Sequence, residues 1–311
     1  MPLPDFKKTT QDKAAIPPWA KYLKDNEFIS YSVTYKGKQY YGLFDEYAYP
    51  CKETGDIKYY VYDPVKHGAS PRKKYPALMF FHGASNALMG IDCIMCCGAE
   101  QFASPDYQEK MGGAYVIVPA ANESRAEDGR IDGAWSDFGI PYSISVMGIW
   151  NRLANEYKDN IGSKIILGAS SGGAFTWKLL EEYPDYFDGA MPIAAGYTPS
   201  RESLKSIGKT KTKILIAHGR YDEMAEFDKC IKPFLEDFKA MRNTELFLPK
   251  WVYNGDGGVA SVFYGFEMGQ HCMINWVQSN LMFDDGRAAD KDLLPQGATG
   301  WIKKISHGKI Y

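Results

Sequence analysis

The sequence predicts an α/β fold with a mostly parallel central sheet, an N-terminal antiparallel hairpin and helices on both faces. Three observations support it. Short apolar runs of strand size alternate with longer amphipathic segments, the pattern of a parallel sheet covered by helices. A β-rich segment precedes this alternation. No repeat and no Gly/Ser-rich linker divides the 311 residues, so we expect a single domain over 1–311.

The first β-rich segment predicts the hairpin. Residues 28–35 and 39–44 have strand composition and flank Lys36-Gly37-Lys38, a turn signal. Residues 57–62 form a third β-rich run. We expect residues 1–27, which are polar and rich in proline, to form a loosely held arm.

The alternating region supplies the rest of the fold. The expected strands are 77–81, 114–118, 164–167, 189–193, 213–217 and 246–252. The expected helices are 143–157, 175–183, 227–241 and 271–281. Two long stretches, 84–112 and 121–142, follow the first two of these strands and fit the alternation poorly. Because α/β sheets bind ligands at the carboxyl ends of their strands, we interpret both as pocket or lid loops.

The strongest chemical signal is the run GASSGG at 168–173. It lies between an expected strand and an expected helix, the context of a G-x-S-x-G nucleophile elbow. A tight turn needs small neighbours two residues before and after its apex, and Gly168 and Gly172 meet that need for Ser170. The N–H of Ser171, at the helix start, would then face a developing oxyanion. A Gly-rich turn with a bystander serine is the alternative, and Ser171 is the rival nucleophile.

A second signal is FFHGAS at 80–85, directly after a buried strand. In acyl-transfer α/β enzymes this loop supplies the other oxyanion N–H, here from about Ala84. We interpret the side chain of His82 as a buried structural group that hydrogen-bonds the loop backbone.

A catalytic acid and base are expected later in the chain. Asp222 follows the strand at 213–217 and could orient a histidine, with Glu223 and Glu202 as rivals and a solvated turn aspartate as the alternative. Of the five histidines, His271 alone lies on a late loop after this acid. His67 and His307 lie in polar segments, and His82 and His218 in strand-end turns. The order Ser170, Asp222, His271 is the one expected of an α/β-hydrolase triad.

On these motifs the chain resembles the α/β-hydrolase superfamily over about residues 59–281. Within it, KYPALMFFHG at 74–83 and EYPDYF at 182–187 are similar to esterases related to polyhydroxybutyrate depolymerase and to feruloyl and acetyl-xylan esterases. Ser171 departs from that group, in which Asn or Met often follows the nucleophile. The resemblance implies ester hydrolysis, with feruloyl or acetyl esters of plant polysaccharide as a substrate class.

Three further features of the sequence carry weaker signals. Trp135 in the second long loop is expected to line the substrate site, or equally to pack that loop onto the body. The C-x-x-C at 93–96 lacks a second ligand pair, so we interpret it as apolar and expect no metal site. Nucleotide-binding signatures are absent from the sequence, and we expect no cofactor.

Composition excludes several other classes. The formal net charge of −2 disfavours a nucleic-acid binder and an electrostatic membrane anchor. No apolar run approaches the roughly 18 residues of a transmembrane helix. Six cysteines in so long a chain do not suggest a disulfide scaffold. Without an apolar run near Met1 we expect no secretory signal and a cytoplasmic protein, although cleavage of a signal would leave the same pattern.

The sequence therefore predicts a serine carboxylic-ester hydrolase that acts through an acyl-enzyme on a small or carbohydrate-linked ester. A serine peptidase of the prolyl-oligopeptidase type would share the same triad. A non-catalytic binding protein on this fold is the third possibility, and the motifs do not fix an oligomeric state.

Overall fold

The computed structural model describes residues 40–83, 94, 99–122, 124–125, 131–132, 134–135, 140–222, 224–249, 271 and 297–307. The strands are β1 (Asp45–Tyr49), β2 (Ile57–Tyr62), β3 (Tyr75–Phe81), β4 (Tyr115–Pro119), β5 (Ser124–Arg125), β6 (Ile131–Asp132), β7 (Ile161–Ala169), β8 (Gly189–Ile193), β9 (Lys213–Ala217) and β10 (Thr244–Phe247). The helices are η2 (Tyr41–Leu43), η3 (Ala99–Ala103), α4 (Pro105–Met111), α5 (Tyr142–Glu156), α6 (Ser171–Glu182), α7 (Arg201–Ile207), α8 (Phe227–Cys230), η5 (Lys232–Phe234), α9 (Leu235–Ala240) and α11 (Gly297–His307).

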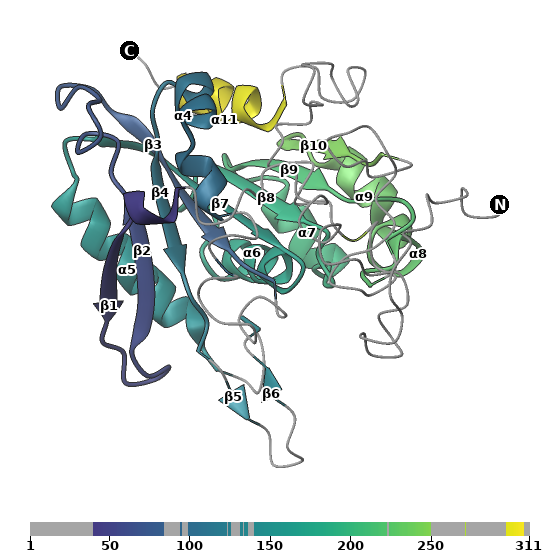
Figure 1. Ribbon diagram of the computed structural model, residues 1–311. Coiled ribbons are helices and arrows are strands. Elements are labelled where there is room, and N and C mark those ends of the chain that lie inside the picture. The colour runs from purple at the N-terminus through teal and green to yellow at the C-terminus, as the bar shows by residue number, and fades with distance from the viewer. Residues whose placement is uncertain are drawn as a thin grey trace, which may run out of the picture.

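Eight strands form one sheet in the order β1-β2-β4-β3-β7-β8-β9-β10 (Figure 1). Pairing is parallel from β4 to β10, whereas β1–β2 and β2–β4 are antiparallel. The antiparallel strands thus occupy one edge, as the sequence predicts. The carboxyl ends of β3, β7 and β9 all lie at the same end of the sheet, which brings together the loops that follow these strands.

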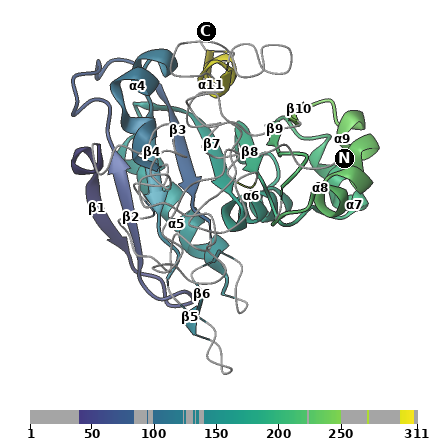
Figure 2. The ribbon, with the colours of Figure 1, turned by 45° about the vertical axis from the view of Figure 1, so that its right-hand side comes forward.

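Two hydrophobic cores cover the two faces of the sheet. Ala77, Met79 and Phe81 of β3 belong to the core beneath α5, α6 and α9. Leu78 and Phe80 belong to the core beneath α4 and α11. Side chains alternate between faces along a strand, so a strand between two helical layers is apolar at every position. All seven residues of β3 are accordingly buried, and the two helical layers are visible on opposite sides of the sheet (Figure 2).

The predicted N-terminal hairpin is shifted along the chain. Residues 28–35 lie outside the described residues, and the strand expected at 39–44 is wrong because residues Tyr41–Leu43 form the 3-10 helix η2. The edge strand is β1, which pairs with β2. Its side chains are exposed or half-buried, so its apolar signal in the sequence is weak.

One predicted helix needs correction, and both expected pocket loops contain secondary structure. The single helix expected at 227–241 is divided into α8, η5 and α9, because Pro233 has no N–H for an α-helical hydrogen bond. The expected pocket loop 84–112 contains η3 and α4 in its second half, and Phe102 and Tyr107 there are buried in the core. The other expected loop, 121–142, contains the short antiparallel pair β5–β6.

The sequence pattern does not predict helices α7 and α11. Of the helix expected at 271–281, only residue 271 lies within the described residues. Among the helices described, none has both the length and the apolar character required to cross a bilayer.

Candidate active site

The turn between β7 and α6 holds Ser170 in an unusual backbone conformation. Its φ is 57° and its ψ is −115°, a region that costs a non-glycine residue about 1–3 kcal/mol. The surrounding backbone fixes the turn, because the N–H of Ser170 donates to the carbonyl of Ile193 at 2.9 Å and the N–H of Ala174 donates to the carbonyl of Ser170 at 3.0 Å. A strained serine at the apex of a strand-to-helix turn is the geometry of a nucleophile elbow.

Glycine is required on both sides of this serine. A Cβ atom on Gly168 would lie 2.3 Å from the carbonyl oxygen of Gly172. A Cβ atom on Gly172 would lie 2.1 Å from the carbonyl oxygen of Phe81, at the end of β3. The obstructing atoms are backbone and cannot rotate away. The spacing of the two glycines therefore has a steric cause. At Gly168 and Gly172, the backbone of α6 approaches β7 and β3 too closely to leave room for a Cβ atom.

Ser171 differs from Ser170 in its environment. Ser171 is the first residue of α6, so its N–H lies in the first helical turn, where backbone N–H groups have no acceptor within the helix. Its hydroxyl oxygen accepts a hydrogen bond from the N–H of Trp135 at 3.0 Å. The positive φ falls on Ser170, so Ser170 rather than Ser171 lies at the apex of the turn.

Asp222 and His271 form a buried pair. The Nδ1 atom of His271 lies 2.8 Å from each carboxylate oxygen of Asp222. The side chain of Asp222 is fully buried and that of His271 is 8% exposed. Because a carboxylate only accepts hydrogen bonds, Nδ1 of the ring must carry the proton. The neutral imidazole then has its lone pair on Nε2, which is the tautomer a general base needs.

Backbone N–H groups of the turn after β9 hold the carboxylate of Asp222 in place. Its Oδ1 accepts the N–H groups of Met224 at 2.9 Å and Ala225 at 2.7 Å. These two hydrogen bonds fix the orientation of the carboxylate independently of its contact with His271. Of the rival acids, Glu202 lies exposed on α7 and Glu223 lies outside the described residues.

His218 also contacts the turn that follows β9. It is buried, and its Nε2 atom donates to the carbonyl of Ala225 at 2.7 Å while lying 3.7 Å from Oδ2 of Asp222. Burial lowers its pKa, and the nearby Asp222 carboxylate opposes part of that shift. A neutral ring at this position adds no charge beneath the Asp222–His271 pair. The prediction that His218 is structural agrees with these contacts.

His82 has the structural role that the sequence predicts. Its ring is fully buried, Nδ1 donates to the carbonyl of Gly83 at 2.8 Å, and Nε2 accepts the N–H of Ala121 at 3.0 Å. Burial lowers the pKa of His82 to about 4. The neutral ring thereby holds the start of the loop that follows β3. Ala84, expected to donate to the oxyanion from this loop, lies outside the described residues.

Trp135 packs within the core. Its ring is 0% exposed and lies against Phe81, Phe175 and Tyr142, with ring centroids 5.2–5.4 Å away. Its Nε1–H donates to the carbonyl of His82 at 3.1 Å. The sequence suggests two roles for Trp135, lining the substrate site or packing its loop onto the body of the protein. These contacts are of the packing kind. Sequence reasoning missed the hydrogen bonds because both link Trp135 to distant segments.

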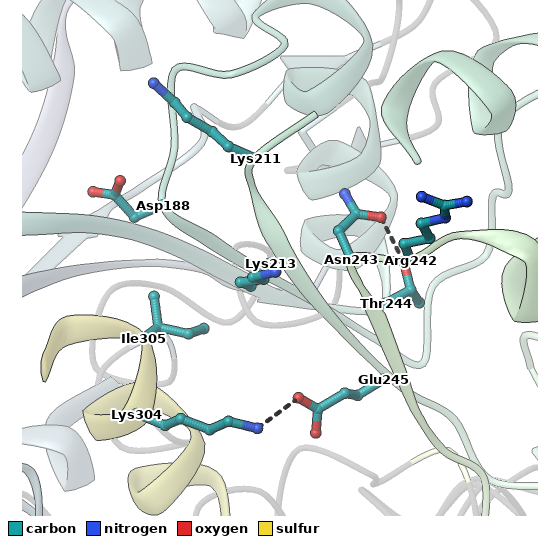
Figure 3. Close-up of a pocket in the computed structure, with 9 residues that line it drawn as sticks. All are labelled: Asp188, Lys211, Lys213, Arg242, Asn243, Thr244, Glu245, Lys304 and Ile305. Atoms are coloured by element: carbon teal, nitrogen blue, oxygen red, sulfur yellow. Dashed lines mark hydrogen bonds and ion pairs between the residues drawn. The ribbon is translucent and has the colours of Figure 1, made fainter. Parts of the chain in front are cut away.

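A cavity of about 370 Å³ lies elsewhere in the molecule (Figure 3). It is lined by Lys213 and Thr244, which begin β9 and β10, and by Lys304 of α11, which pairs with Glu245 at 3.5 Å. The amino ends of these strands lie opposite the end that carries Ser170 and Asp222. The cavity is therefore separate from the candidate active site.

The described residues contain no group of three or more His, Cys, Asp or Glu side chains placed to hold a metal ion. Cys93 and Cys96, the two thiols of the C-x-x-C, lie outside the described residues.

Comparison with known proteins gives structural matches only. No protein-family model matches the chain, and no curated protein matches it in sequence. A thermostable esterase superposes with a TM-score of 0.59 at 19% identity, over 85% of this chain and 63% of the esterase, which is less than two thirds of its length. A protein called FAE gives a TM-score of 0.51 at 15% identity, over 82% of this chain and 87% of that one. This chain therefore shares their fold, and the α/β-hydrolase fold predicted from the sequence is confirmed.

Proposed function

We propose that this chain, which has the α/β-hydrolase fold, is a serine carboxylic-ester hydrolase that works through an acyl-enzyme. One observation carries the proposal. Ser170 occupies the strained apex of the β7–α6 turn, at the same end of the sheet as the buried Asp222–His271 pair. A hydroxyl at an elbow and an imidazole held by a carboxylate are the parts that nucleophilic acyl transfer requires.

The reaction follows from the roles these groups can take. Nε2 of His271 removes the proton of Ser170 as the hydroxyl attacks the acyl carbonyl. Asp222 keeps the proton of His271 on Nδ1 and stabilises the imidazolium that forms. His271 then gives its proton to the departing alcohol, which leaves an acyl group on Ser170. Water, activated by the same imidazole, releases the acid and restores the serine.

The negative charge that develops on the carbonyl oxygen needs hydrogen-bond donors. The N–H of Ser171, in the first turn of α6, is suited to this role because helix N-terminal N–H groups point outward and carry partial positive charge. We assign the second donor to the backbone near Ala84. Neither role requires a metal or an organic cofactor.

The substrate class comes from resemblance. The motifs at 74–83 and 182–187 are similar to feruloyl and acetyl-xylan esterases, and one structural neighbour is described as a thermostable esterase. We therefore propose acetyl or feruloyl esters, free or attached to carbohydrate, as substrates.

The test compares the wild type with Ser170→Ala on acetyl, butyryl and feruloyl esters of p-nitrophenol and methanol. Loss of at least about three orders of magnitude in kcat is expected when a triad nucleophile is removed. Aminoacyl anilides are assayed in parallel, and a preference for them would identify a peptidase. Absence of all turnover, with no labelling of Ser170 by a fluorophosphonate, would identify a non-catalytic binding protein.

A further inference from the structure

Trp135 joins the start of α6, where the proposed oxyanion donor Ser171 lies, to His82 at the end of β3. Its backbone N–H donates to the hydroxyl oxygen of Ser171 at 3.0 Å, at the start of α6. Its indole N–H donates to the carbonyl of His82 at 3.1 Å, two residues before Ala84. One residue thus holds the start of α6 and the end of β3 together, from a loop that belongs to neither.

We propose that Trp135 and the hydroxyl of Ser171 are positioning residues that hold the start of α6, and with it the proposed oxyanion donor N–H of Ser171, at a set distance from the end of β3. The proposal rests on the proposed ester-hydrolase function and deepens it. It gives the second serine of the GASSGG run a purpose other than nucleophilic attack, and it gives Trp135 a purpose other than lining a substrate pocket.

The indole is held firmly enough to act in this way. Its ring stacks on Phe175 of α6 with an interplanar angle of 15°, and meets the edges of Phe81 and Tyr142. With no exposed surface, it cannot rotate without displacing these neighbours. The two hydrogen bonds therefore connect parts of the molecule that packing already makes rigid.

The His82 side of the connection is equally constrained. The ring of His82 is tied to Gly83 and Ala121, so its backbone has little freedom of its own. The carbonyl of His82 also lies 2.8 Å from the position of a Cβ atom on Gly172, which places α6 directly against it. A change at Trp135 or Ser171 would alter the spacing between α6 and this loop rather than the fold as a whole.

Such a change should act on the transition state. A misplaced donor weakens the hydrogen bond to the oxyanion, which exists only after attack, and leaves substrate binding nearly unaffected. We therefore expect Trp135→Phe and Ser171→Ala each to lower kcat by about 10-fold or more with less than about a 3-fold change in KM. Ser171→Thr keeps the acceptor oxygen and should retain most of the wild-type kcat.

The controls are matched in residue type and burial. Trp150→Phe, in α5, removes a buried indole whose Nε1 has no hydrogen-bond partner among the described residues. Ser145→Ala removes a buried hydroxyl that donates to the carbonyl of Tyr142 in the same helix. Both should lower thermal stability without changing kcat per active site, which is counted for every variant by fluorophosphonate labelling.

A second readout is inhibition by an alkyl trifluoromethyl ketone, whose serine adduct carries the oxyanion. The inhibition constant should rise in Trp135→Phe and Ser171→Ala by about the factor by which kcat/KM falls. The positioning role is wrong if these variants match Trp150→Phe and Ser145→Ala in kcat and in inhibition while the wild type is an active esterase. If the wild type itself neither hydrolyses esters nor labels at Ser170, it is the proposed function that fails.

Discussion

The Nδ1 atom of His271 lies 2.8 Å from both carboxylate oxygens of Asp222, although 49 residues separate them in the chain. Asp222 is positioned by two backbone N–H groups of its own turn and by the buried strand β9 before it. His271 comes from a segment of which no other residue is described. A symmetric contact with a fully buried carboxylate fixes both the tautomer and the direction of the ring.

Asp222→Asn should therefore lower kcat/KM for ester hydrolysis by about 10⁴-fold at neutral pH, because an amide stabilises neither the required tautomer nor the imidazolium. Stopped-flow or steady-state assays at constant labelled-site concentration measure this. Glu202→Gln, at the exposed rival acid on α7, is the control and should remain at the wild-type rate. Comparable losses in the two variants would remove Asp222 from the mechanism.

Ser170→Gly should separate stability from activity. Glycine adopts positive φ without the steric cost that serine bears at 57°, so the free energy of unfolding should increase by about 1 kcal/mol while turnover is lost. Urea unfolding monitored by tryptophan fluorescence measures the change. Lys178→Gly within α6 provides the opposite control, with an expected loss of about 1 kcal/mol. A less stable Ser170→Gly protein would argue against backbone strain at the elbow.

Gly172→Ala should be severely destabilising, because its Cβ would meet the carbonyl of Phe81 at 2.1 Å. We expect a loss of at least about 3 kcal/mol in the free energy of unfolding. Gly196→Ala, where no atom lies within 4 Å of the new Cβ, should be nearly neutral. Equal stabilities, measured by thermal unfolding, would show that α6 does not approach β3 as closely as described.

Stability should fall in mild acid because of His82. The pKa of His82 is about 4 in the folded protein and 6.5 for an ordinary histidine, the value taken for the unfolded chain. Between pH 6.5 and pH 4 the unfolded chain therefore binds a proton at this ring that the folded protein does not. Stability from this group is complete above pH 6.5 and is lost as the pH falls towards 4. A difference of about 2.5 pKa units corresponds to roughly 3 kcal/mol. His218, whose pKa is also lowered by burial, acts in the same direction.

Urea titrations at several pH values between 7.5 and 4.5 test this dependence. In His82→Gln the free energy of unfolding should fall less steeply with pH than in the wild type. His67→Gln, at an exposed histidine, controls for loss of a histidine elsewhere. Identical slopes for the wild type and His82→Gln would show that His82 does not carry the effect.

The sequence predicted the buried part of the fold well. Strands β8 and β9 have the expected bounds, because parallel strands covered on both faces are continuous apolar runs between turn signals. Strand β1 was not predicted, because its exposed residues show little alternation between apolar and polar side chains. It is recognised as a strand only by its pairing with β2 at the edge of the sheet. Pro233 lies at the break between α8 and α9, inside the amphipathic period from which the single helix at 227–241 is predicted.

The candidate site was predictable where chemistry depends on local spacing. The glycines around Ser170 and the acid after β9 could be read directly. The contacts of Trp135 could not, because they join residues 36 and 53 positions away through tertiary packing. No local pattern distinguishes an aromatic residue that lines a pocket from one that ties two loops together.

On the proposed mechanism, Ser170 becomes acylated during turnover. The most direct measurement is acid quench of the enzyme with p-nitrophenyl butyrate, tryptic digestion and fragmentation of the peptide at 165–178, which contains Ser170 and Ser171. The wild type should carry a butyryl group on Ser170, and Ser170→Ala should carry none. A butyryl group on Ser171, or turnover with no acylated peptide at any time point, would contradict it.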